Sequence, residues 1–373
     1  MKYKAFKDIS LSRLGLGNMR LPSLEPGKPG SPIDYAAAHA IMDRAYQAGI
    51  NYFDTAYVYN NGDSERCVGE GMKKYPRDSF YLATKFNIGA NPDYRAVFAE
   101  QLERLQTDRI DFYLIHCVMD GNAKQYIDSG AIEYFLDMKA QGKITWLGFS
   151  SHASPDTLRM FADHHDWDFA QIQLNGFDWR FSTTKEEYEI LTERNIPIMV
   201  MEPVRGGRLS HLTPEAEALL KAKHPDWSIS SWALRFVKSL PGVQVILSGM
   251  SNLEQMNDNL NTFADDSGLT QEETALYIQA CEMFKAQLQV PCTACRYCTD
   301  GCPGEINIPE FLKLYNNYKV DGFWALFGWE KIETVGTPKD CIGCGACTGH
   351  CPQNIDTPKI MSELAELLAK KRT

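Results

Sequence analysis

The sequence contains no apolar run close to the ~20 residues that a membrane-spanning helix needs. Its first ten residues, MKYKAFKDIS, also lack the apolar stretch of a secretory signal. Basic residues are in the minority, because 38 Lys and Arg face 48 Asp and Glu, and the formal net charge is −10. Since binding to phosphate backbones requires a basic face, we expect a cytoplasmic protein that uses neither nucleic acid nor a membrane as a partner.

A G-x-G-x-x-G motif is missing after the first apolar run, which disfavours an open, doubly wound sheet. The chain up to residue 262 instead alternates short apolar runs with segments of helical spacing. We predict strands at 13–17, 50–54, 80–86, 110–116, 144–150, 169–175, 196–202 and 243–249. We predict helices at 34–49, 64–74, 94–106, 131–142, 155–165, 184–195, 228–239, 252–263 and 269–288. Strand–helix units of this number, over about 250 residues, predict an α/β fold of the (β/α)8 TIM-barrel type.

Four ionisable residues fall at, or just after, the ends of the second, third and fourth predicted strands: Asp54, Tyr59, Lys85 and His116. Active sites of such barrels lie at the carboxyl ends of the strands. A lysine favours the phenolate form of a nearby tyrosine and so lowers the tyrosine pKa, while a carboxylate keeps the lysine charged. Histidine can polarise a carbonyl or pass a proton. Each residue alone is more often a structural contact, but together they predict a catalytic acid–base site.

The segment FDTAYVYNNGDSERCVGEGM at 53–72 contains a D-T-A-x-x-Y…S-E…G pattern. Together with ATK, YLIH, GFSS, AQIQLN, EPVRGG and SGMSNLEQMNDNL, it resembles the aldo-keto reductases over roughly residues 8–262. The resemblance implies hydride transfer between NADP or NAD and a small carbonyl or alcohol substrate. It also implies that Tyr59 is the general acid/base, assisted by Lys85, Asp54 and His116.

The same resemblance implies where the cofactor binds. It assigns cofactor contacts to Gly17, Asn18, Met19, Ser150, Ser151, Gln171, Met201, Glu202, Pro203, Val204, Gly206, Gly207, Gly249, Ser251, Gln255 and Asn259. Gly249 and Gln255 stand where the family commonly has the Lys and Arg that hold the 2′-phosphate of NADP, so the choice between NADP and NAD stays open. Arg205 and Arg208 could replace that charge, or could be solvated loop residues.

Most of the 11 cysteines lie in the last quarter of the chain, in two C-x2-C-x2-C-x3-C-P runs. This spacing is the bacterial ferredoxin signature, in which the fourth cysteine of a run ligates the other cluster. We therefore predict two [4Fe–4S] clusters. The first is assigned to Cys292, Cys295, Cys298 and Cys351, and the second to Cys302, Cys341, Cys344 and Cys347. Zinc would leave the third cysteine of each run surplus, and disulfides are disfavoured in a reducing compartment.

These signals divide the chain into a barrel at 1–265, a linking helix at 266–288 and a small, mostly α-helical domain at 289–373. The last domain resembles the ferredoxin-like iron–sulfur domains of redox enzymes, and we predict helices in it at 306–331 and 362–371. No motif surrounds the remaining cysteines or one barrel histidine, so we predict structural roles for Cys67, Cys117, Cys281 and His152.

The combination leaves several functions open. A nicotinamide transfers two electrons as a hydride, whereas a [4Fe–4S] cluster takes one, and the sequence shows no flavin motif to connect them. The clusters could exchange electrons with a redox partner protein (a flavoprotein or a ferredoxin), could reduce the substrate by single electrons, or could only hold the second domain in shape. An aldo-keto reductase with electron-transferring clusters is the first hypothesis. The alternative is an electron-transfer or redox-sensing protein whose nicotinamide-binding barrel is a docking or regulatory scaffold.

Overall fold

The computed structural model describes residues 1–25, 31–288, 290, 292, 294, 296, 298–299, 301–351, 353 and 355–370. The chain divides into two compact units, Met1–Ala280 and Cys281–Thr373, and each is described by itself. Within these described ranges, no helix combines the length and the apolar composition that crossing a membrane requires.

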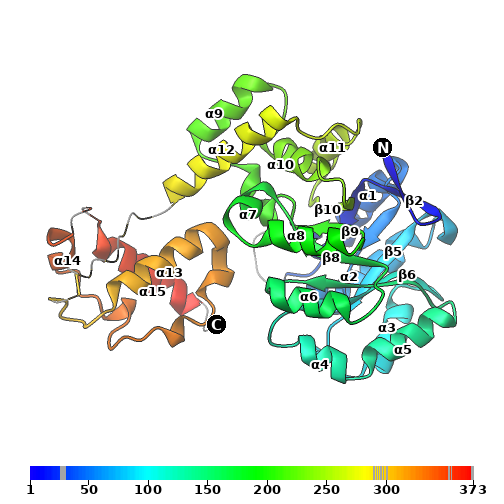
Figure 1. The fold of residues 1–373 in the computed structure, drawn as a ribbon, viewed down its shortest axis with the longest axis horizontal. Coiled ribbons are helices and arrows are strands. Elements are labelled where there is room, and N and C mark those ends of the chain that lie inside the picture. Colours follow the sequence, from blue (N-terminus) through cyan, green and yellow to red (C-terminus); the bar gives the residue numbers. More distant parts are fainter. Residues whose placement is uncertain are drawn as a thin grey trace. The chain divides into compact units, whose positions relative to one another are not determined.

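The first unit is a closed barrel of parallel strands, which confirms the predicted fold (Figure 1). Each strand pairs with its neighbours in chain order and the last pairs with the first, so the ring of strands is complete. The strands are β3 (Leu14–Gly17), β4 (Tyr52–Asp54), β5 (Tyr81–Phe86), β6 (Ile110–Val118), β7 (Ile144–Ser151), β8 (Phe169–Gln173), β9 (Ile198–Met201) and β10 (Val243–Ser248). All of them overlap the ranges predicted from apolar runs.

Helices follow the strands along the chain, and several begin at side-chain caps. Asp93 Oδ1 accepts a hydrogen bond from the Ala96 N–H at 3.0 Å, for example. The expected helices are α1 (Tyr35–Gln47), α2 (Asp63–Met72), α3 (Tyr94–Arg104), α5 (Ala131–Ala140), α6 (Pro155–Asp163), α8 (Thr184–Glu193), α10 (Ile229–Lys238) and α11 (Leu253–Thr262). The structure adds α4 (Ala123–Asp128), α7 (Gly176–Phe181) and α9 (Pro214–Lys223), which we did not predict. At six residues each, α4 and α7 are too short to show a helical period.

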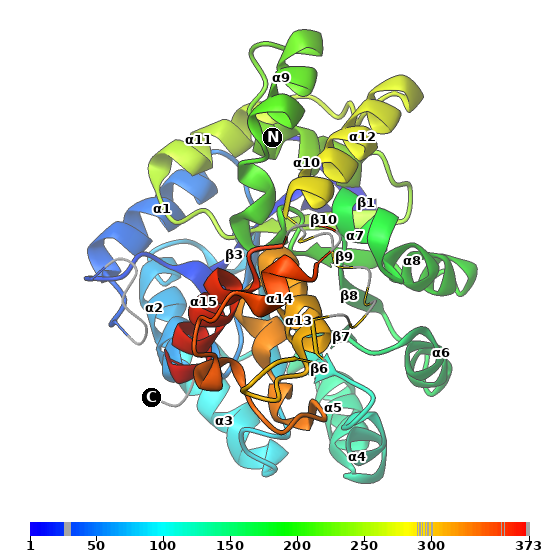
Figure 2. The ribbon, with the colours of Figure 1, turned by 90° about the vertical axis from the view of Figure 1, so that its left-hand side faces the viewer.

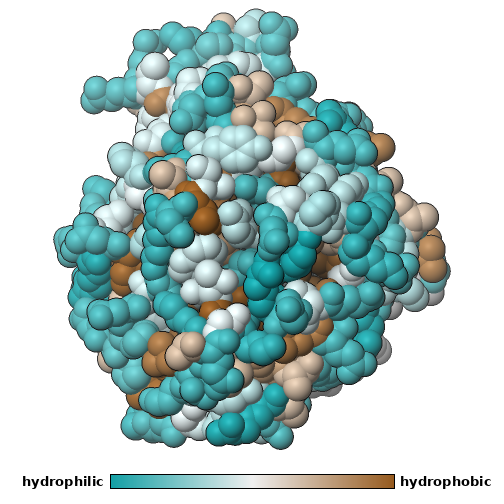
Figure 3. Space-filling model, turned by 90° about the vertical axis from the view of Figure 1, so that its right-hand side faces the viewer, coloured by the Kyte–Doolittle hydropathy of each residue, from teal (hydrophilic) through white to brown (hydrophobic). Residues whose placement is uncertain are grey.

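An amino-terminal hairpin that we did not predict precedes the barrel. Its strands β1 (Tyr3–Phe6) and β2 (Ile9–Ser12) pair antiparallel. Phe6 is buried, and its ring lies 5.4 Å from that of Phe112 and 5.5 Å from that of Trp146, near the amino ends of β6 and β7. The hairpin therefore packs its apolar side chains into that end of the barrel. Figure 3 shows the side of the molecule that carries it, where hydrophilic residues predominate and hydrophobic ones are scattered.

The long helix α12 (Gln271–Leu288) begins as part of the barrel unit. Tyr277 is fully buried, and its ring lies 5.8 Å from that of Phe236. Gly176 makes room for it, because a Cβ at this position would stand 2.3 Å from Tyr277 Cε1. Residues 271–280 thus complete the packing of the barrel, although we predicted this segment as a linker.

The second unit is built on α13 (Ile308–Asp321) and α15 (Thr357–Lys370), which lie side by side, with the short α14 (Ala346–Gly349) nearby (Figures 1 and 2). The predicted helix at 306–331 is correct only as far as Asp321. Gly322 follows with φ +74° and ψ −155°, a conformation that favours glycine and ends the helix. The core between the helices includes Phe311, Met361 and Leu364.

Candidate active site

The barrel holds a buried ion pair at the carboxyl ends of β4 and β5. Lys85 Nζ lies 2.6 and 2.7 Å from the two carboxylate oxygens of Asp54. It donates a third hydrogen bond, of 2.7 Å, to the carbonyl oxygen of Thr55. Lys85 is fully buried and Asp54 nearly so. An ammonium group has three N–H donors, so Lys85 uses all of them inside the protein.

Tyr59 begins the short 3-10 helix η2 (Tyr59–Gly62), and its ring lies beside two of the other predicted catalytic residues. Lys85 Nζ is 5.1 Å from the centre of the Tyr59 ring. The rings of Tyr59 and His116 are 5.8 Å apart and nearly perpendicular. Asn60 and Asn61 follow with φ of +50° and +56°, a strained conformation for residues other than glycine. The structure therefore brings all four predicted catalytic side chains together around a strained turn.

The pKa of Tyr59 differs from the expectation drawn from the sequence. Burial raises it well above its usual value, and the charges of Asp54, Cys117 and Glu202 raise it further. We expected Lys85 to lower it, but Lys85 directs its hydrogen bonds to Asp54 and Thr55. Tyr59 consequently keeps its proton at neutral pH and can act as an acid. Cys117, for which we predicted only a structural role, belongs to the surroundings of this hydroxyl.

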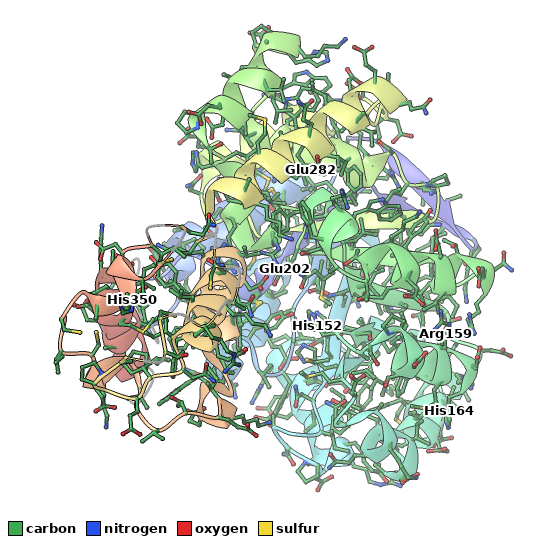
Figure 4. The ribbon with its side chains drawn as sticks, turned by 60° about the vertical axis from the view of Figure 1, so that its left-hand side comes forward. His152, Arg159, His164, Glu202, Glu282 and His350 are labelled. Atoms are coloured by element: carbon green, nitrogen blue, oxygen red, sulfur yellow. The ribbon has the colours of Figure 1, made fainter. Side chains whose placement is uncertain are left out.

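His116 is neutral at pH 7. Burial, together with the charges of Lys85 and His152, places the pKa of His116 well below its usual value. Among the residues that the structure describes, the buried Nδ1 of His116 has no hydrogen-bond partner. A neutral imidazole donates one N–H and accepts at the other nitrogen, so this ring can contact a substrate oxygen. Figure 4 shows His152 among the strand ends, whereas Arg159 lies on the outer helix α6 and His164 directly follows that helix.

Polar residues on β7 and β8 fit the amide group of a nicotinamide. Ser150, Ser151 and Gln171 are at most 2% exposed. Gln171 Nε2 faces Met201 Sδ at 3.6 Å, but in the described part of the chain its buried Oε1 accepts no hydrogen bond. A buried acceptor without a donor costs about 1–3 kcal/mol. An amide N–H2 of a bound cofactor would remove that cost.

Backbone hydrogen bonds hold the neighbouring polar groups in place. Ser150 Oγ accepts from the Cys117 N–H at 2.8 Å, and Ser151 Oγ accepts from the Ala153 N–H at 3.1 Å. Neither hydroxyl donates to an acceptor among the residues that the structure describes, so each can donate its proton to a ligand. Asn18, after Gly17 at the end of β3, donates from Nδ2 to the carbonyl oxygen of Asp54 at 2.8 Å. Its buried Oδ1 is a further acceptor without a donor among the described residues.

The segment after β9 forms a loop of unusual backbone conformation. Glu202, Arg205, Gly206 and Gly207 all have positive φ, between +50° and +94°. Arg205 Nε pairs with Asp178 Oδ1 at 2.9 Å, and both side chains are largely buried. We had considered Arg205 as a replacement for the missing phosphate-binding residues, but this ion pair already engages it. The other predicted cofactor contacts in the segment are Met201, Pro203 and Val204.

The polar side chains after β10 form hydrogen bonds with other groups of the protein. The Ser251 N–H donates to Gln255 Oε1 at 2.8 Å, and Ser251 Oγ donates to the carbonyl oxygen of Arg20 at 2.7 Å. Asn259 Nδ2 donates to Ser248 Oγ at 2.9 Å. These contacts fix the loop around Gly249, but they supply no positive charge for a 2′-phosphate.

Arg20 is a residue of the site that we missed from the sequence. It ends the 3-10 helix η1 (Asn18–Arg20), directly after the half-exposed Met19. A Cβ on Gly249 would lie 3.4 Å from Arg20 Cβ, and a Cβ on Gly206 would lie 2.8 Å from Arg20 Nη2. Its exposed side chain thus reaches from the loop after β3 to the loops after β9 and β10. Its position next to the predicted contact Met19 was the available signal.

The second unit contains a pocket lined by cysteines of both runs. Cys302 comes from the first run and Cys341, Cys344 and Cys347 from the second. The same pocket is lined by the first residues of α13 and α15. This is the ligand set that we predicted for the second cluster. Of the first set, Cys292, Cys298 and Cys351 pack partly buried against the core of the unit, and Cys295 lies outside the described residues.

The matches to family profiles fall into the same two parts of the chain as the two compact units, Met1–Ala280 and Cys281–Thr373. The profile of the aldo/keto reductase family matches residues 13–281. The chain belongs to the aldo/keto reductase family. A 4Fe-4S dicluster domain profile matches residues 291–355, so in this aldo/keto reductase an iron–sulfur domain follows the barrel.

Relatives of this aldo/keto reductase are named as an oxidoreductase, as reductases and as a dehydrogenase. It is 29% identical over 299 residues to the uncharacterized oxidoreductase YqkF of Bacillus subtilis, a match over 71% of this chain and 91% of YqkF. It is 28% identical over 223 residues to the NADH-specific methylglyoxal reductase of Escherichia coli, a match over 54% of this chain and 67% of that enzyme. The holo form of aldo-keto reductase AKR11C1 from Bacillus halodurans superposes with a TM-score of 0.62 at 28% identity, over 75% of this chain and 96% of that one. The chain is thus an oxidoreductase of the aldo/keto reductase type with a 4Fe-4S domain.

Proposed function

We propose that the barrel transfers a hydride between NADPH or NADH and a small carbonyl or alcohol substrate. The observation that carries this proposal is the buried Asp54–Lys85 pair beside Tyr59 and His116 at the strand ends. Membership of the aldo/keto reductase family supports the same reaction class. A bound nicotinamide supplies or accepts the hydride. The unpaired acceptor of Gln171 supports a site that would orient its amide group.

Tyr59 is the proposed general acid and base. Because its pKa is raised, it holds a proton that it donates to the carbonyl oxygen as this oxygen gains negative charge. The charge of Lys85, 5.1 Å from the centre of the Tyr59 ring, stabilises the phenolate that remains without a hydrogen bond to it, and Asp54 keeps Lys85 charged. Neutral His116 donates its N–H to the same oxygen and so orients the substrate. In the oxidation direction, the phenolate takes the proton from the alcohol.

We also propose how the nucleotide is held. The loops after β3, β9 and β10 contain many of the contacts that the family resemblance assigns, and the others lie on the strands or in α11. Arg20 joins these loops, whereas Arg205 is paired with Asp178. Arg20 is therefore our candidate for the residue that contacts the 2′-phosphate of NADPH, since a guanidinium binds phosphate well.

For the second unit we propose two [4Fe–4S] clusters with the ligand sets given above. The pocket shared by Cys302 and the 341–347 run supports the second set. We propose that the clusters carry electrons to or from a partner protein, a flavoprotein or a ferredoxin. A cytoplasmic location fits thiolates used as ligands. The proposed domains remain 1–265, 266–288 and 289–373, although the contacts place residues up to 280 with the barrel.

A second candidate function is electron transfer or redox sensing with the barrel as a docking or regulatory scaffold. The dicluster domain favours it, because such domains usually carry electrons between proteins. Anaerobic stopped-flow spectroscopy separates the two candidates. The wild-type protein and the Tyr59→Phe variant are mixed with NADPH or NADH, with and without a panel of small aldehydes and ketones.

If the barrel is a carbonyl reductase, oxidation of the nicotinamide should depend on the added carbonyl compound. Tyr59→Phe should then lower kcat by roughly 10²–10⁴-fold while it still binds the cofactor. Equal turnover in both proteins would refute the role of Tyr59. Bleaching of the clusters by the nicotinamide without any carbonyl turnover would favour the scaffold function. For the clusters, Cys302→Ala should lower the iron content, whereas Cys67→Ala, outside both runs, should not.

A further inference from the structure

Tyr59 is followed by three consecutive residues in the left-handed conformation. The φ angles are +50° at Asn60, +56° at Asn61 and +87° at Gly62. Glycine adopts this conformation readily, whereas a residue with a Cβ is strained in it. A strained segment persists only where the surrounding structure holds it. The chain on both sides of this turn must therefore be fixed.

Arg104, the last residue of α3, contacts both sides of the turn. Its Nη1 donates a hydrogen bond of 3.2 Å to the carbonyl oxygen of Tyr57, two residues before Tyr59. The same nitrogen donates to Glu65 Oε2 at 3.1 Å, and Glu65 lies in the first turn of α2, directly after the left-handed segment. The guanidinium also touches that segment, because a Cβ on Gly62 would lie 3.0 Å from Nη1 and 3.3 Å from Cζ.

Further contacts fix the orientation of the guanidinium. It lies over the ring of Tyr57, with Cζ 4.4 Å from the ring centre. Nη2 donates to one carboxylate oxygen of Glu100, and the other oxygen accepts from the Tyr57 hydroxyl at 2.9 Å. The side chains of Arg104 and Glu65 are 10% and 0% exposed. A planar guanidinium can make all of these contacts at once, whereas the ammonium of a lysine is a compact point charge.

We infer that Arg104 is a positioning residue for Tyr59, because it ties together the two flanks of the left-handed turn. This inference rests on the proposed role of Tyr59 as the acid. Lys85 Nζ lies 5.1 Å, and the centre of the His116 ring 5.8 Å, from the centre of the Tyr59 ring. Without Arg104 the turn relaxes, and these distances change. A misplacement of about 1 Å can lower a rate about 10²-fold.

The test compares variants of the anaerobic full-length protein. Arg104→Lys keeps a positive charge beside Glu65 but lacks the planar group. Asn60→Gly combined with Asn61→Gly removes the strain from the turn, and this pair is made in the wild type and in Arg104→Lys. For each protein we measure kcat, the Kd for the nicotinamide and the melting temperature. The substrate is the aldehyde or ketone of the panel that the wild type reduces fastest.

Arg77→Lys is the matched control. Arg77 also pairs with a buried carboxylate, because its Nη2 lies 2.6 Å from Asp111 Oδ2. It donates to the carbonyl oxygens of Phe80 and Arg109 at 3.0 and 3.1 Å. These contacts lie at the amino ends of β5 and β6, away from Tyr59. The control therefore separates a general loss of stability from a displaced catalytic tyrosine.

We expect Arg104→Lys to lower kcat about 10–100-fold. The Kd for the nicotinamide should stay close to the wild-type value, because the proposed nucleotide contacts lie in other segments. The two glycines should raise kcat of Arg104→Lys about three- to tenfold, since glycine adopts the left-handed turn without strain. They should not raise kcat of the wild type, whose turn is already held. Arg77→Lys should lower the melting temperature and keep kcat near the wild-type value.

An unchanged kcat in Arg104→Lys overturns the inference. A loss that the two glycines do not reduce, or an equal loss in Arg77→Lys, overturns it as well, because either result indicates a general effect of destabilisation. If Arg104→Lys does not fold, Arg104→Met combined with Glu65→Gln decides by the same criteria, since it leaves neither charge of that pair behind. Turnover that Tyr59→Phe does not lower would instead refute the proposed function.

Discussion

Removing one partner of the buried Asp54–Lys85 pair should lower the stability of the barrel far more than removing an exposed charge. In Asp54→Asn, Lys85 remains fully buried without its counter-charge. Breaking a buried pair in this way costs about 3–5 kcal/mol. At roughly 2–4 °C per kcal/mol for a domain near this size, the barrel should unfold roughly 6–20 °C below the wild type. The measurement is scanning calorimetry of the anaerobic full-length protein, following the barrel transition.

Two control variants test this explanation. Lys124 and Asp128 form an exposed pair at 2.7 Å, and Asp128→Asn should change stability by less than about 1 kcal/mol. The double variant Asp54→Leu with Lys85→Met removes both buried charges, and such replacements are often neutral for stability. It should therefore recover stability while losing turnover. If the Asp54→Asn variant is as stable as the Asp128→Asn variant, Lys85 does not need the charge of Asp54 to offset the cost of its burial, and the explanation is wrong.

Three further outcomes are expected. Because the pKa of His116 lies well below its usual value and that of Tyr59 well above, the rate of carbonyl reduction should stay level from about pH 6 to 9; a fall with an apparent pKa near 6.5 would contradict the neutral histidine. Arg20→Ala should weaken NADPH binding about 10–100-fold, as for the loss of one charge-assisted hydrogen bond, and NADH binding little; fluorescence titration showing equal losses would contradict contact with the 2′-phosphate. A chain that ends at residue 265 lacks Tyr277 and should unfold more readily than one that ends at 280, because Phe236 and Gly176 lose their buried neighbour; equal urea midpoints would contradict this.

The barrel could be predicted because its signal is local. Each strand is a short apolar run between helical segments, and the runs 80–86 and 144–150 predicted β5 and β7 closely. The hairpin of β1 and β2 was missed because its strands have four residues each and mix polar with apolar side chains. The end of α13 was also missed, since a single glycine conformation at Gly322 terminates it.

The sequence was enough to propose which residues form the catalytic site, but not to predict the electrostatics around them. The identities of Asp54, Lys85 and His116 follow from their positions at strand ends. The raised pKa of Tyr59 does not, because it depends on burial and on which acceptors Lys85 uses in three dimensions. Arg20 was missed for a related reason, since the glycines that it contacts are far away in the sequence.

The amino-terminal hairpin also bears on the order of events in turnover. Phe6 and Leu11 pack into the core at the amino ends of the strands and close that end of the barrel. Substrate and nucleotide must therefore both enter and leave at the carboxyl ends of the strands. When two reactants share one entrance, the reactant that binds deeper has to bind first and dissociate last. If the buried Gln171 holds the nicotinamide amide as proposed, the nucleotide is that reactant. Steady-state kinetics should then show compulsory-order binding, with the spent nucleotide competing with the fresh one for the free enzyme.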